Sequence, residues 1–478
     1  MSLTEEQSTV TPAAGGNLFS WRFTTPLFLG SALNPVNSSL IATALLPIAR
    51  DLGVQIGQTA ALVSALYLAS AITLPTAGKA AEVFGPRRVF MTGIALVILG
   101  AAFGGLAQSL WMLLVSRVVI GLGTACAYPT AMLIIQRRAR EAGRAKPPGG
   151  VLGGLMIAGI ATASLGLPLG GVLVNALSWR SIFFVNVPVA VAALVAAAVW
   201  IQPDPRRGTR MRAREISSKL DTLGFLGFVG AMLTLLVFLF GLPTAHWWVL
   251  GLSALFWAGL VWWELRAGTP FLDVRLLASN AGLANTYARF GLTQLCAYVV
   301  LYGITQWVES VRGFSESTAG LLLLPMTVVS GVIILPLSRR GLVRGPVVTA
   351  SAAVLLGSIG VLLLSSTAWI GLVLALTLVF GLAIGLSTAG NQTALTQHAP
   401  AEQTGTAAGL LRTFGYVGSI GASAVTGLVF HHNVTDHGVH QIGWIMTAAG
   451  VLLVTLTLTD RTLRPVRHRP PDVAATSD

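Results

Sequence analysis

Apolar runs of about twenty residues recur from residue 24 to residue 461 of this chain, with only short polar segments between them. A helix of roughly 20 apolar residues is long enough to cross the hydrocarbon core of a bilayer. The composition agrees, because 54% of the 478 residues are hydrophobic and only 10% are charged. The sequence therefore predicts an all-α polytopic membrane protein and excludes a water-soluble globular chain.

The lengths of the runs and of their breaks predict about fourteen transmembrane helices. The expected spans are 24–48, 57–80, 88–107, 109–136, 149–174, 181–201, 220–241, 246–264, 283–308, 317–338, 346–366, 368–392, 404–430 and 441–460. The longest basic linker follows the sixth span, and a second break precedes the last six. Two six-helix bundles around a central substrate site are the usual plan of a secondary transporter.

The expected domain boundaries follow from these breaks. They are a cytoplasmic N-terminal tail (1–23), an N-terminal six-helix bundle (24–201), a basic cytoplasmic linker (202–219), two inserted transmembrane helices (220–264), a cytoplasmic linker (265–282), a C-terminal six-helix bundle (283–460) and a cytoplasmic C-terminal tail (461–478). The N-terminal tail is polar and acidic and lacks the regions of a cleaved signal, so the first span is expected to stay as an uncleaved anchor.

The formal net charge of +13 is concentrated in alternate loops. The basic groups follow the even-numbered spans, at Arg87 and Arg88, 137–146, 206–219, Arg266 and Arg275, 339–345 and 461–469. By the positive-inside rule, these loops and both termini are cytoplasmic. The alternation favours a topological role for the basic runs over recognition of lipid or nucleic acid, and no nucleic-acid partner is expected.

The loop after the second span reads "GKAAEVFGPRR" (78–88). Gly78 and Gly85 permit a tight turn, while Glu82 supplies an anion suited to a helix N-terminus and Arg87 and Arg88 add cations at the same membrane face. These residues are expected to form a conformational latch, whose ionic contacts break when two bundles rock against each other.

The fifth span is rich in glycine and contains "SLGLPLGG" (164–171). Small residues at a spacing of four let helix backbones approach closely. Gly166, Pro168, Gly170 and Gly171 are therefore expected to form a helix-packing motif.

The first span is polar in its middle, at "GSALNPVNSSL" (30–40). On a helix, Asn34, Asn37 and Ser38 share a face, and Pro35 permits a kink. That face is expected to line a central cavity and to offer neutral hydrogen bonds to a small-molecule substrate. The alternative is that these side chains only tie the first span to a neighbouring helix.

Charged and aromatic residues within other spans extend the expected cavity. A buried arginine is costly, so it normally faces a bundle interior or a wet cavity. Aromatic rings near such a cavity can stack on a planar substrate, although most pack against neighbours. The expected cavity set adds Arg117, Tyr128, Tyr287, Arg289 and Gln306, with Tyr298, Tyr302, Trp307 and Arg412 also within spans. For Arg117, the alternative is that it binds backbone carbonyls and only holds helices together.

Several of these segments resemble signatures of the major facilitator superfamily. The 78–88 loop is similar to the superfamily signature after span two, with Glu82 in place of the usual Asp, and "SRVVIGLG" is similar to the span-four signature, with Ile120 in place of Gln. "SLGLPLGG" resembles the exporter signature of span five. "LSWRSIFFVNVPVAV" (177–191) is similar to the entry of span six in the fourteen-span drug:proton antiporter branch. The resemblance covers nearly the whole chain and implies the major facilitator fold with two inserted helices, alternating access, efflux and a monomer.

One departure from that branch concerns the proton site. Ser38 falls where the branch usually has an Asp, and the first span contains no carboxylate. A buried carboxylate suits proton coupling because desolvation raises its pKa toward neutrality. Glu309, near the outer end of span nine, is therefore the proton-coupling candidate. The alternative is an ordinary interfacial acid paired with Arg312.

Two transport functions remain open at this stage, beside a non-transporting receptor or scaffold that would bind a substrate without flux. The leading one is a secondary transporter of the multidrug efflux type, which exports small amphipathic compounds across a plasma membrane in exchange for protons. The alternative is a carrier of a specific neutral or anionic metabolite with different or no proton coupling, which suits the neutral first span and the intramembrane arginines.

Enzymatic and metal chemistry are not expected. The spans show no converging set of catalytic side chains, so neither an enzyme nor a cofactor is predicted. Cys126 and Cys296 lie in apolar runs, where a thiol is usually a packing residue. The loop "HHNVTDHGVH" (431–440) fits no standard zinc spacing, so no metal site is predicted.

Overall fold

The computed structural model describes residues 19–143, 149–204, 221–241, 246–268, 270, 274–340, 342–398 and 404–463. Every regular element in these ranges is helical. An all-helical chain satisfies its backbone hydrogen bonds within each segment, as a membrane interior requires.

The first half of the chain forms nine helical elements in the described ranges. These are α1 (Trp21–Leu40), η1 (Ile41–Thr43), α2 (Leu45–Leu52), α3 (Ile56–Phe84), α4 (Pro86–Gly105), α5 (Leu110–Glu141), α6 (Gly149–Ala176), α7 (Ser181–Phe184) and α8 (Asn186–Trp200). Between the halves lie α10 (Thr222–Gly241), α11 (Trp247–Glu264) and α12 (Val274–Ser279).

The second half begins at α13. Its elements are α13 (Ala281–Val299), η2 (Val300–Ile304), α14 (Thr305–Ser310), α15 (Glu316–Arg340), α16 (Arg344–Val361), α17 (Ile370–His398), α18 (Thr404–Val429), α19 (Asp436–Thr459) and η4 (Arg461–Leu463). The segment η2 is a π-helical turn that joins α13 to α14.

Each predicted span coincides with a helix or with consecutive helices, give or take a few residues. Among the described residues, eight helices are long and apolar enough to cross a membrane, or nine if the bent pair α1–η1 and α2 is one span. The bend of 58° falls at Ala44. Pro47 contributes to it, because it has no N–H to donate to the carbonyl four residues earlier. The count of fourteen stays a prediction.

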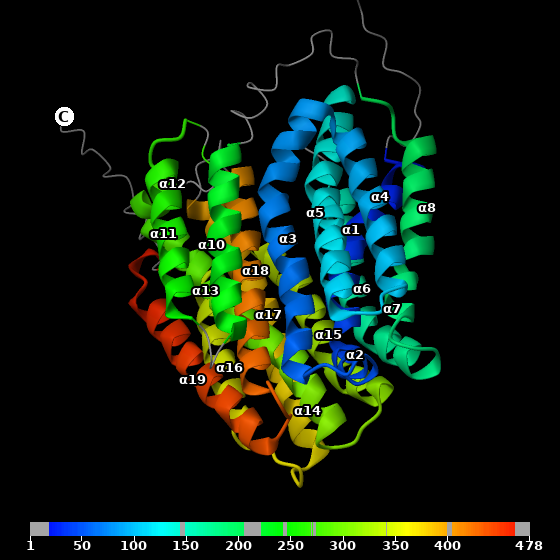
Figure 1. The fold of residues 1–478 in the computed structure, drawn as a ribbon. Helices are drawn as coiled ribbons and strands as arrows, with labels where there is room; N and C mark the ends of the chain where they lie inside the picture. Colours follow the sequence, from blue (N-terminus) through cyan, green and yellow to red (C-terminus); the bar gives the residue numbers. More distant parts are fainter. Residues whose placement is uncertain are drawn as a thin grey trace, which may run out of the picture.

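The helices form two bundles that meet along a shared interface (Figure 1). Helix α3 of the N-terminal half packs on α18 of the C-terminal half, and α6 packs on α15. Helix α10 contacts both α3 and α18, so the inserted pair α10 and α11 covers one edge of this interface. One cluster of buried apolar side chains runs through both halves, and two others lie within a single half each.

Both described chain ends, near Ser20 and Leu463, lie at the same end of the bundle, called the terminal end below (Figure 1). The opposite end is called the distal end. Helix α3 begins at the distal end, and α18 ends there.

The two halves are in close contact at the distal end. Gly57 of α3 lies against Gly427 and His431, where a Cβ atom would come within 2.7 Å of the His431 Cα. Gly171 of α6 lies against α15, where a Cβ atom would come within 2.7 Å of the Ser317 Cα. Ser317 also donates a hydrogen bond to the Gly171 carbonyl at 3.0 Å. Glycine therefore permits both distal contacts between the halves.

Candidate functional site

A group of tyrosines occupies the middle of the interface between the halves. Tyr67 of α3 meets Tyr298 of α13 and Tyr416 of α18, with ring centroids 5.3 Å and 5.5 Å apart. Tyr302 of η2 stacks on Tyr298 at 5.6 Å, and its hydroxyl lies 3.2 Å from that of Tyr67. These four residues, called the central tyrosine cluster, are four of only six tyrosines in the chain. The sequence pointed to Tyr298 and Tyr302 but missed Tyr67 and Tyr416.

The polar residues of the first span reach this cluster. The Asn34 amide donates to Thr124 at 2.9 Å and to Ser70 at 3.3 Å, and its oxygen accepts from the Tyr416 hydroxyl at 3.5 Å. The Ser38 carbonyl accepts from the Tyr302 hydroxyl at 3.2 Å. Asn34 and Ser38 thus connect α1 to the opposite half.

Asn37 has a different environment. It is buried, and its amide donates to the Asn186 side chain of α8 at 2.7 Å and to the Leu33 carbonyl at 2.8 Å. Both partners belong to the N-terminal half. Asn37 therefore ties α1 to a neighbouring helix, which is the alternative that the sequence left open.

Arg117 of α5 is 1% exposed and binds backbone rather than a carboxylate. Its Nε donates to the Leu62 carbonyl at 3.1 Å, and one terminal nitrogen donates to the Asn37 carbonyl at 3.5 Å. The other terminal nitrogen is buried with no hydrogen-bond partner among the described residues. The guanidinium group thereby joins α5 to α3 and α1 beside the central tyrosine cluster.

Arg412 of α18 and Tyr128 of α5 meet across the two halves, nearer the terminal end. The guanidinium carbon lies 3.9 Å from the centre of the Tyr128 ring, a cation–π contact. Arg412 is nevertheless exposed, and Tyr128 is half-buried. Arg412 therefore faces the opposite half at the boundary between the two halves and still reaches solvent.

Tyr287 and Arg289 lie in the packed interior of the C-terminal half instead of facing an opening. Arg289 is fully buried, forms an ion pair with Asp460, and donates to Thr286 at 3.1 Å. Tyr287 donates to the Ala407 carbonyl at 3.2 Å. The sequence did not point to Asp460, because its approach to Arg289 depends on how α19 packs against α13.

Gln306 and Glu309 lie on α14, just after the π-helical turn. Gln306 is 1% exposed and Glu309 is 5% exposed. Neither the amide atoms of Gln306 nor the carboxylate oxygens of Glu309 have a hydrogen-bond partner in the described part of the chain. Arg312 donates to the carbonyls of a different loop, including Ser366 at 2.6 Å and Ala368 at 2.7 Å. It forms no ion pair with Glu309 in the structure.

The position of α14 gives Glu309 its significance. Helix α14 packs against α2 and η1 of the N-terminal half and against α15 of its own half. Glu309 therefore lies at the distal end, where the two halves touch. A buried carboxylate without a partner is costly in its ionised form, so such a group usually has a functional reason.

The expected latch residues lie at the terminal end. Gly85 has a φ of 96°, a backbone conformation that favours glycine, and it joins α3 to α4. Asp204 accepts from the backbone N–H groups of Arg87 at 3.3 Å and Arg88 at 3.0 Å. The anion at the start of α4 is therefore Asp204, a residue that sequence reasoning missed. The side chain of Glu82 lies outside the described part of the structure, and a Cβ atom on Gly78 would meet no described atom within 4 Å.

The helix-packing motif lies where α6 meets α1 and α15. A Cβ atom on Gly166 would come within 2.6 Å of Ser39, and one on Gly170 within 2.7 Å of the Thr43 hydroxyl. Pro168 lies between them, inside α6. With Gly171 against α15, the motif lets a single helix approach both halves closely.

Metal-ligating side chains do not gather in the described ranges, where no group of three or more His, Cys, Asp or Glu could hold an ion. The second half of the expected loop 431–440 belongs to α19, where His440 Nε2 lies 2.8 Å from the Leu364 carbonyl oxygen. Cys126 and Cys296 are free thiols.

Two helical bundles that meet around a polar centre and close on each other at one end define a membrane carrier. The sequence comparison agrees, because the Major Facilitator Superfamily model matches residues 27–423. The chain belongs to that superfamily and is a transporter.

Relatives of known sequence include exporters. The chain is 31% identical over 436 residues to the uncharacterized MFS-type transporter YwoD of Bacillus subtilis (strain 168), covering 90% of this chain and 94% of that protein. It is 29% identical to the tetracenomycin C resistance and export protein of Streptomyces glaucescens, and the match covers 89% of this chain and 79% of that protein. It is 28% identical to the multidrug resistance protein Stp of Mycobacterium tuberculosis (strain CDC 1551 / Oshkosh), and the match covers 77% of this chain and 68% of that protein.

Solved structures support the fold. The nucleoside transporter NupG is similar with a TM-score of 0.63 at 12% identity, covering 93% of this chain and 98% of that one. The human organic anion transporter MFSD10 (TETRAN) is similar with a TM-score of 0.57 at 15% identity, and the match covers 93% of this chain and 100% of that one. At these identities the likeness concerns the fold alone.

Proposed function

We propose that this chain is a proton-coupled exporter that moves small amphipathic compounds across the plasma membrane by alternating access. The names of the Streptomyces and Mycobacterium relatives, which are a resistance and export protein and a multidrug resistance protein, support export. The geometry that supports the mechanism best is the buried, unpartnered Glu309 at the distal contact between the halves.

Alternating access requires that this contact open and close. The close glycine contacts support a closed distal end, and the exposure of Arg412 at the boundary between the halves supports access from the terminal end. With the terminal end cytoplasmic, as the basic loops predict, this is the state that takes up cargo from the cell. The opposite state separates α3 from α18 and α6 from α15 at the distal end.

Protonation of Glu309 would couple to that movement. In the closed state an ionised Glu309 would have no hydrogen-bond donor, whereas a neutral carboxyl group can stay buried. When the distal end opens, water reaches the group and it can exchange its proton with the outside. The protonated form therefore favours closure and the ionised form favours opening.

A path from Glu309 to the middle of the protein follows one helix face. Tyr302, Gln306 and Glu309 are spaced by four and three residues, so they lie on the same side of the η2–α14 segment. The unpaired polar atoms of Gln306 and Glu309 are of the kind that ordered water satisfies. Water along this face would carry a proton from Glu309 to the central tyrosine cluster.

The central site suits a neutral or anionic aromatic cargo better than a cation. The helix segments around the centre contain no Asp or Glu, at 21–40, 56–81, 110–140, 281–308 and 404–429. The groups that can meet a cargo there are the Asn34 amide, the central tyrosine cluster and Arg412 on Tyr128. Aromatic rings stack on planar molecules, and a guanidinium group attracts an anion.

This chemistry also favours the second candidate function, a carrier of a specific neutral or anionic metabolite. In either case we assign cargo contact to Asn34, Ser38, Tyr128 and Arg412 with the tyrosine cluster. Gln306 belongs to the proton path, and Asn37, Arg117, Tyr287 and Arg289 hold the helices in place. The latch at Gly78–Arg88 is proposed to act at the terminal end, with Asp204 in the role expected of Glu82.

The decisive test uses purified protein in liposomes with an imposed pH gradient. Uptake of cationic, neutral and anionic dyes is followed for the wild type, for Glu309→Gln and for Glu316→Gln as the matched control at the same end. We expect gradient-driven uptake of neutral and anionic dyes that Glu309→Gln abolishes and Glu316→Gln retains. Flux that ignores the gradient in all three proteins would contradict proton coupling and leave the second candidate.

A further inference from the structure

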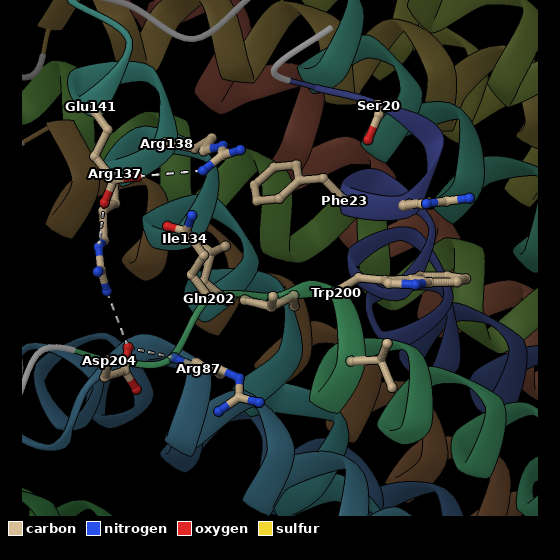
Figure 2. Close-up of a pocket in the computed structure, with 13 residues that line it drawn as sticks. Ser20, Phe23, Arg87, Ile134, Arg137, Arg138, Glu141, Trp200, Gln202 and Asp204 are labelled. Carbon is tan, nitrogen blue, oxygen red and sulfur yellow. Dashed lines mark hydrogen bonds and ion pairs between the residues drawn. The ribbon is translucent and has the colours of Figure 1, made fainter. Parts of the chain in front are cut away.

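A pocket lies at the terminal end, within the N-terminal half and away from the central tyrosine cluster. It has a volume of about 290 Å³ and lies among the start of α1, the start of α4, the end of α5 and the segment that follows α8 (Figure 2). The sequence predicts that this end faces the cytoplasm. The pocket shares Arg87 and Asp204 with the proposed latch, but it lies apart from the proposed cargo site and from Glu309.

The charged side chains that line the pocket are unequal in number. They are four arginines and two acids, namely Arg22, Arg87, Arg137, Arg138, Glu141 and Asp204. The difference leaves two formal positive charges around one small cavity. A positively charged cavity at a membrane surface attracts anions.

The two acids are already engaged. Arg137 pairs with Glu141 at 3.0 Å and with Asp204 at 3.4 Å, and Arg138 lies 3.8 Å from Glu141. Asp204 also accepts from the backbone N–H groups at the start of α4 (Figure 2). Both acids are therefore engaged by Arg137, Arg138 and the backbone, and neither pairs with Arg22 or Arg87 in the described ranges.

Arg22 and Arg87 supply the surplus charge. No ion pair in the described ranges involves either of them. One terminal nitrogen of Arg87 donates to the Ala198 carbonyl at 2.7 Å, but its Nε is buried without a hydrogen-bond partner. A buried donor on a cation is the kind of group that an oxyanion satisfies.

The aromatic side chains beside the pocket are of the kind found at the depth of lipid headgroups. Trp21 is 63% exposed and packs edge-on against Trp200, with ring centroids 5.2 Å apart. Phe23 lies under the Arg138 guanidinium group, 5.9 Å from ring centre to guanidinium carbon. Tryptophans are enriched where a membrane meets water, because their rings are apolar and their N–H is polar.

We propose that this pocket binds a phosphate group, carried by the headgroup of an anionic phospholipid or by free phosphate. Arg22 and Arg87 contact the phosphate oxygens, and Arg137 and Arg138 are held in place by the two acids. Arginine suits this task because its planar fork of donors matches the oxygens of a phosphate. Occupancy would tie α1, α4, α5 and α8 together at their terminal ends.

The test uses the full chain in nanodiscs of phosphatidylcholine, with and without phosphatidylglycerol. The phosphatidylglycerol retained by the protein is measured by native mass spectrometry, and the Tm is measured in parallel. Arg22→Gln and Arg87→Gln remove pocket charges, while Arg140→Gln removes an exposed charge from the same turn of α5 outside the pocket. If Arg87→Gln fails to fold, Arg22→Gln still carries the test, because Arg22 is exposed.

We expect the wild-type protein to retain phosphatidylglycerol and to have a higher Tm in nanodiscs that contain this lipid than in nanodiscs without it. Each pocket variant should bind about five-fold more weakly, since an arginine near an anionic lipid surface contributes about that factor, and Arg140→Gln should match the wild type. Displacement of the lipid by excess inorganic phosphate would identify free phosphate as the occupant, and its failure to compete would identify the headgroup. Equal retention in all four proteins, or equal loss in Arg140→Gln, would overturn the proposal.

Discussion

Asn34 and Asn37 are three positions apart on α1, yet they serve different parts of the molecule. Asn34 bonds to Thr124 in its own half and accepts from Tyr416 in the other. Asn37 is enclosed in the N-terminal half and bonds to Asn186. Three residues on a helix leave two side chains on one face but about 60° apart. That rotation is enough to separate a group available to cargo from one that holds two helices together.

Replacement of Asn37 should lower stability without changing cargo preference. Asn37→Ala leaves the Asn186 side-chain oxygen buried without its donor, which we expect to cost about 1 to 2 kcal/mol. Thermal unfolding in detergent would measure the effect. In a double-mutant cycle with Asn186→Ala, the coupling should be about 0.6 kcal/mol, the average for hydrogen bonds between membrane helices. Strictly additive effects would mean that the two amides do not depend on each other.

Arg412 should select cargo by charge. Arg412→Gln removes the cation that faces the opposite half, so we expect affinity for an anionic dye to fall roughly ten-fold, as for loss of a charged hydrogen bond. A neutral dye of the same size should bind as before. Arg412→Lys, which keeps the charge, should retain most of the preference. Competition binding in detergent measures all three, and equal losses for both dyes would indicate a structural role instead.

At the level of elements, the distal contact depends on helices that approach without Cβ atoms. Gly171 brings α6 against the start of α15, and Gly320 of α15 lies in turn against the Leu167 backbone. Helix backbones at this distance make many van der Waals contacts, and such packing drives the association of helices in lipid. The same closeness makes the contact sensitive to a single methyl group. In the proposed mechanism, the α6–α15 contact closes the distal end, and small residues make its close approach possible.

A methyl group at Gly171 should push the halves apart at the distal end. In Gly171→Ala the new Cβ would lie within 2.7 Å of the Ser317 Cα, and such overpacking costs about 1 to 3 kcal/mol. The closed state alone bears this cost, so the population should shift toward an open distal end. Distances between spin labels on the distal ends of α6 and α15 would report it. Gly251→Ala on α11, where no atom lies within 4 Å, is the control and should leave the distances unchanged.

The helical elements could be predicted from the sequence, but the partners of the polar residues could not. Hydropathy alone predicted where helices lie because a run of apolar residues has few other places to go in lipid. The pairing of Arg289 with Asp460 and of Asp204 with the start of α4 joins residues far apart in the chain. The central tyrosine cluster likewise needs four helical segments to be assembled. Local patterns carry no information about such contacts, because they depend on how whole helices pack.

At the scale of the whole molecule, the two halves are in close contact at the distal end, and Glu309 is buried in that contact. Two charged side chains interact electrostatically with Glu309, namely Glu316 at the start of α15 and Arg50 on α2. Neither of them forms an ion pair with it. The cost of burying this carboxyl group therefore depends on whether it carries a proton, and this dependence links pH to the arrangement of the two halves.

Raising the pH should open the distal end in the wild type. Once Glu309 loses its proton, the closed state must bury an unpartnered charge, while the open state hydrates it, so the equilibrium shifts toward opening. Spin labels on α2 and α14 would show a distance that grows with pH. Glu309→Gln keeps a neutral group of the same size and should stay closed at every pH, whereas Glu316→Gln should still respond. A pH response that persists unchanged in Glu309→Gln would place the proton switch on another group, and the closed distal end would then owe its stability to the glycine contacts alone.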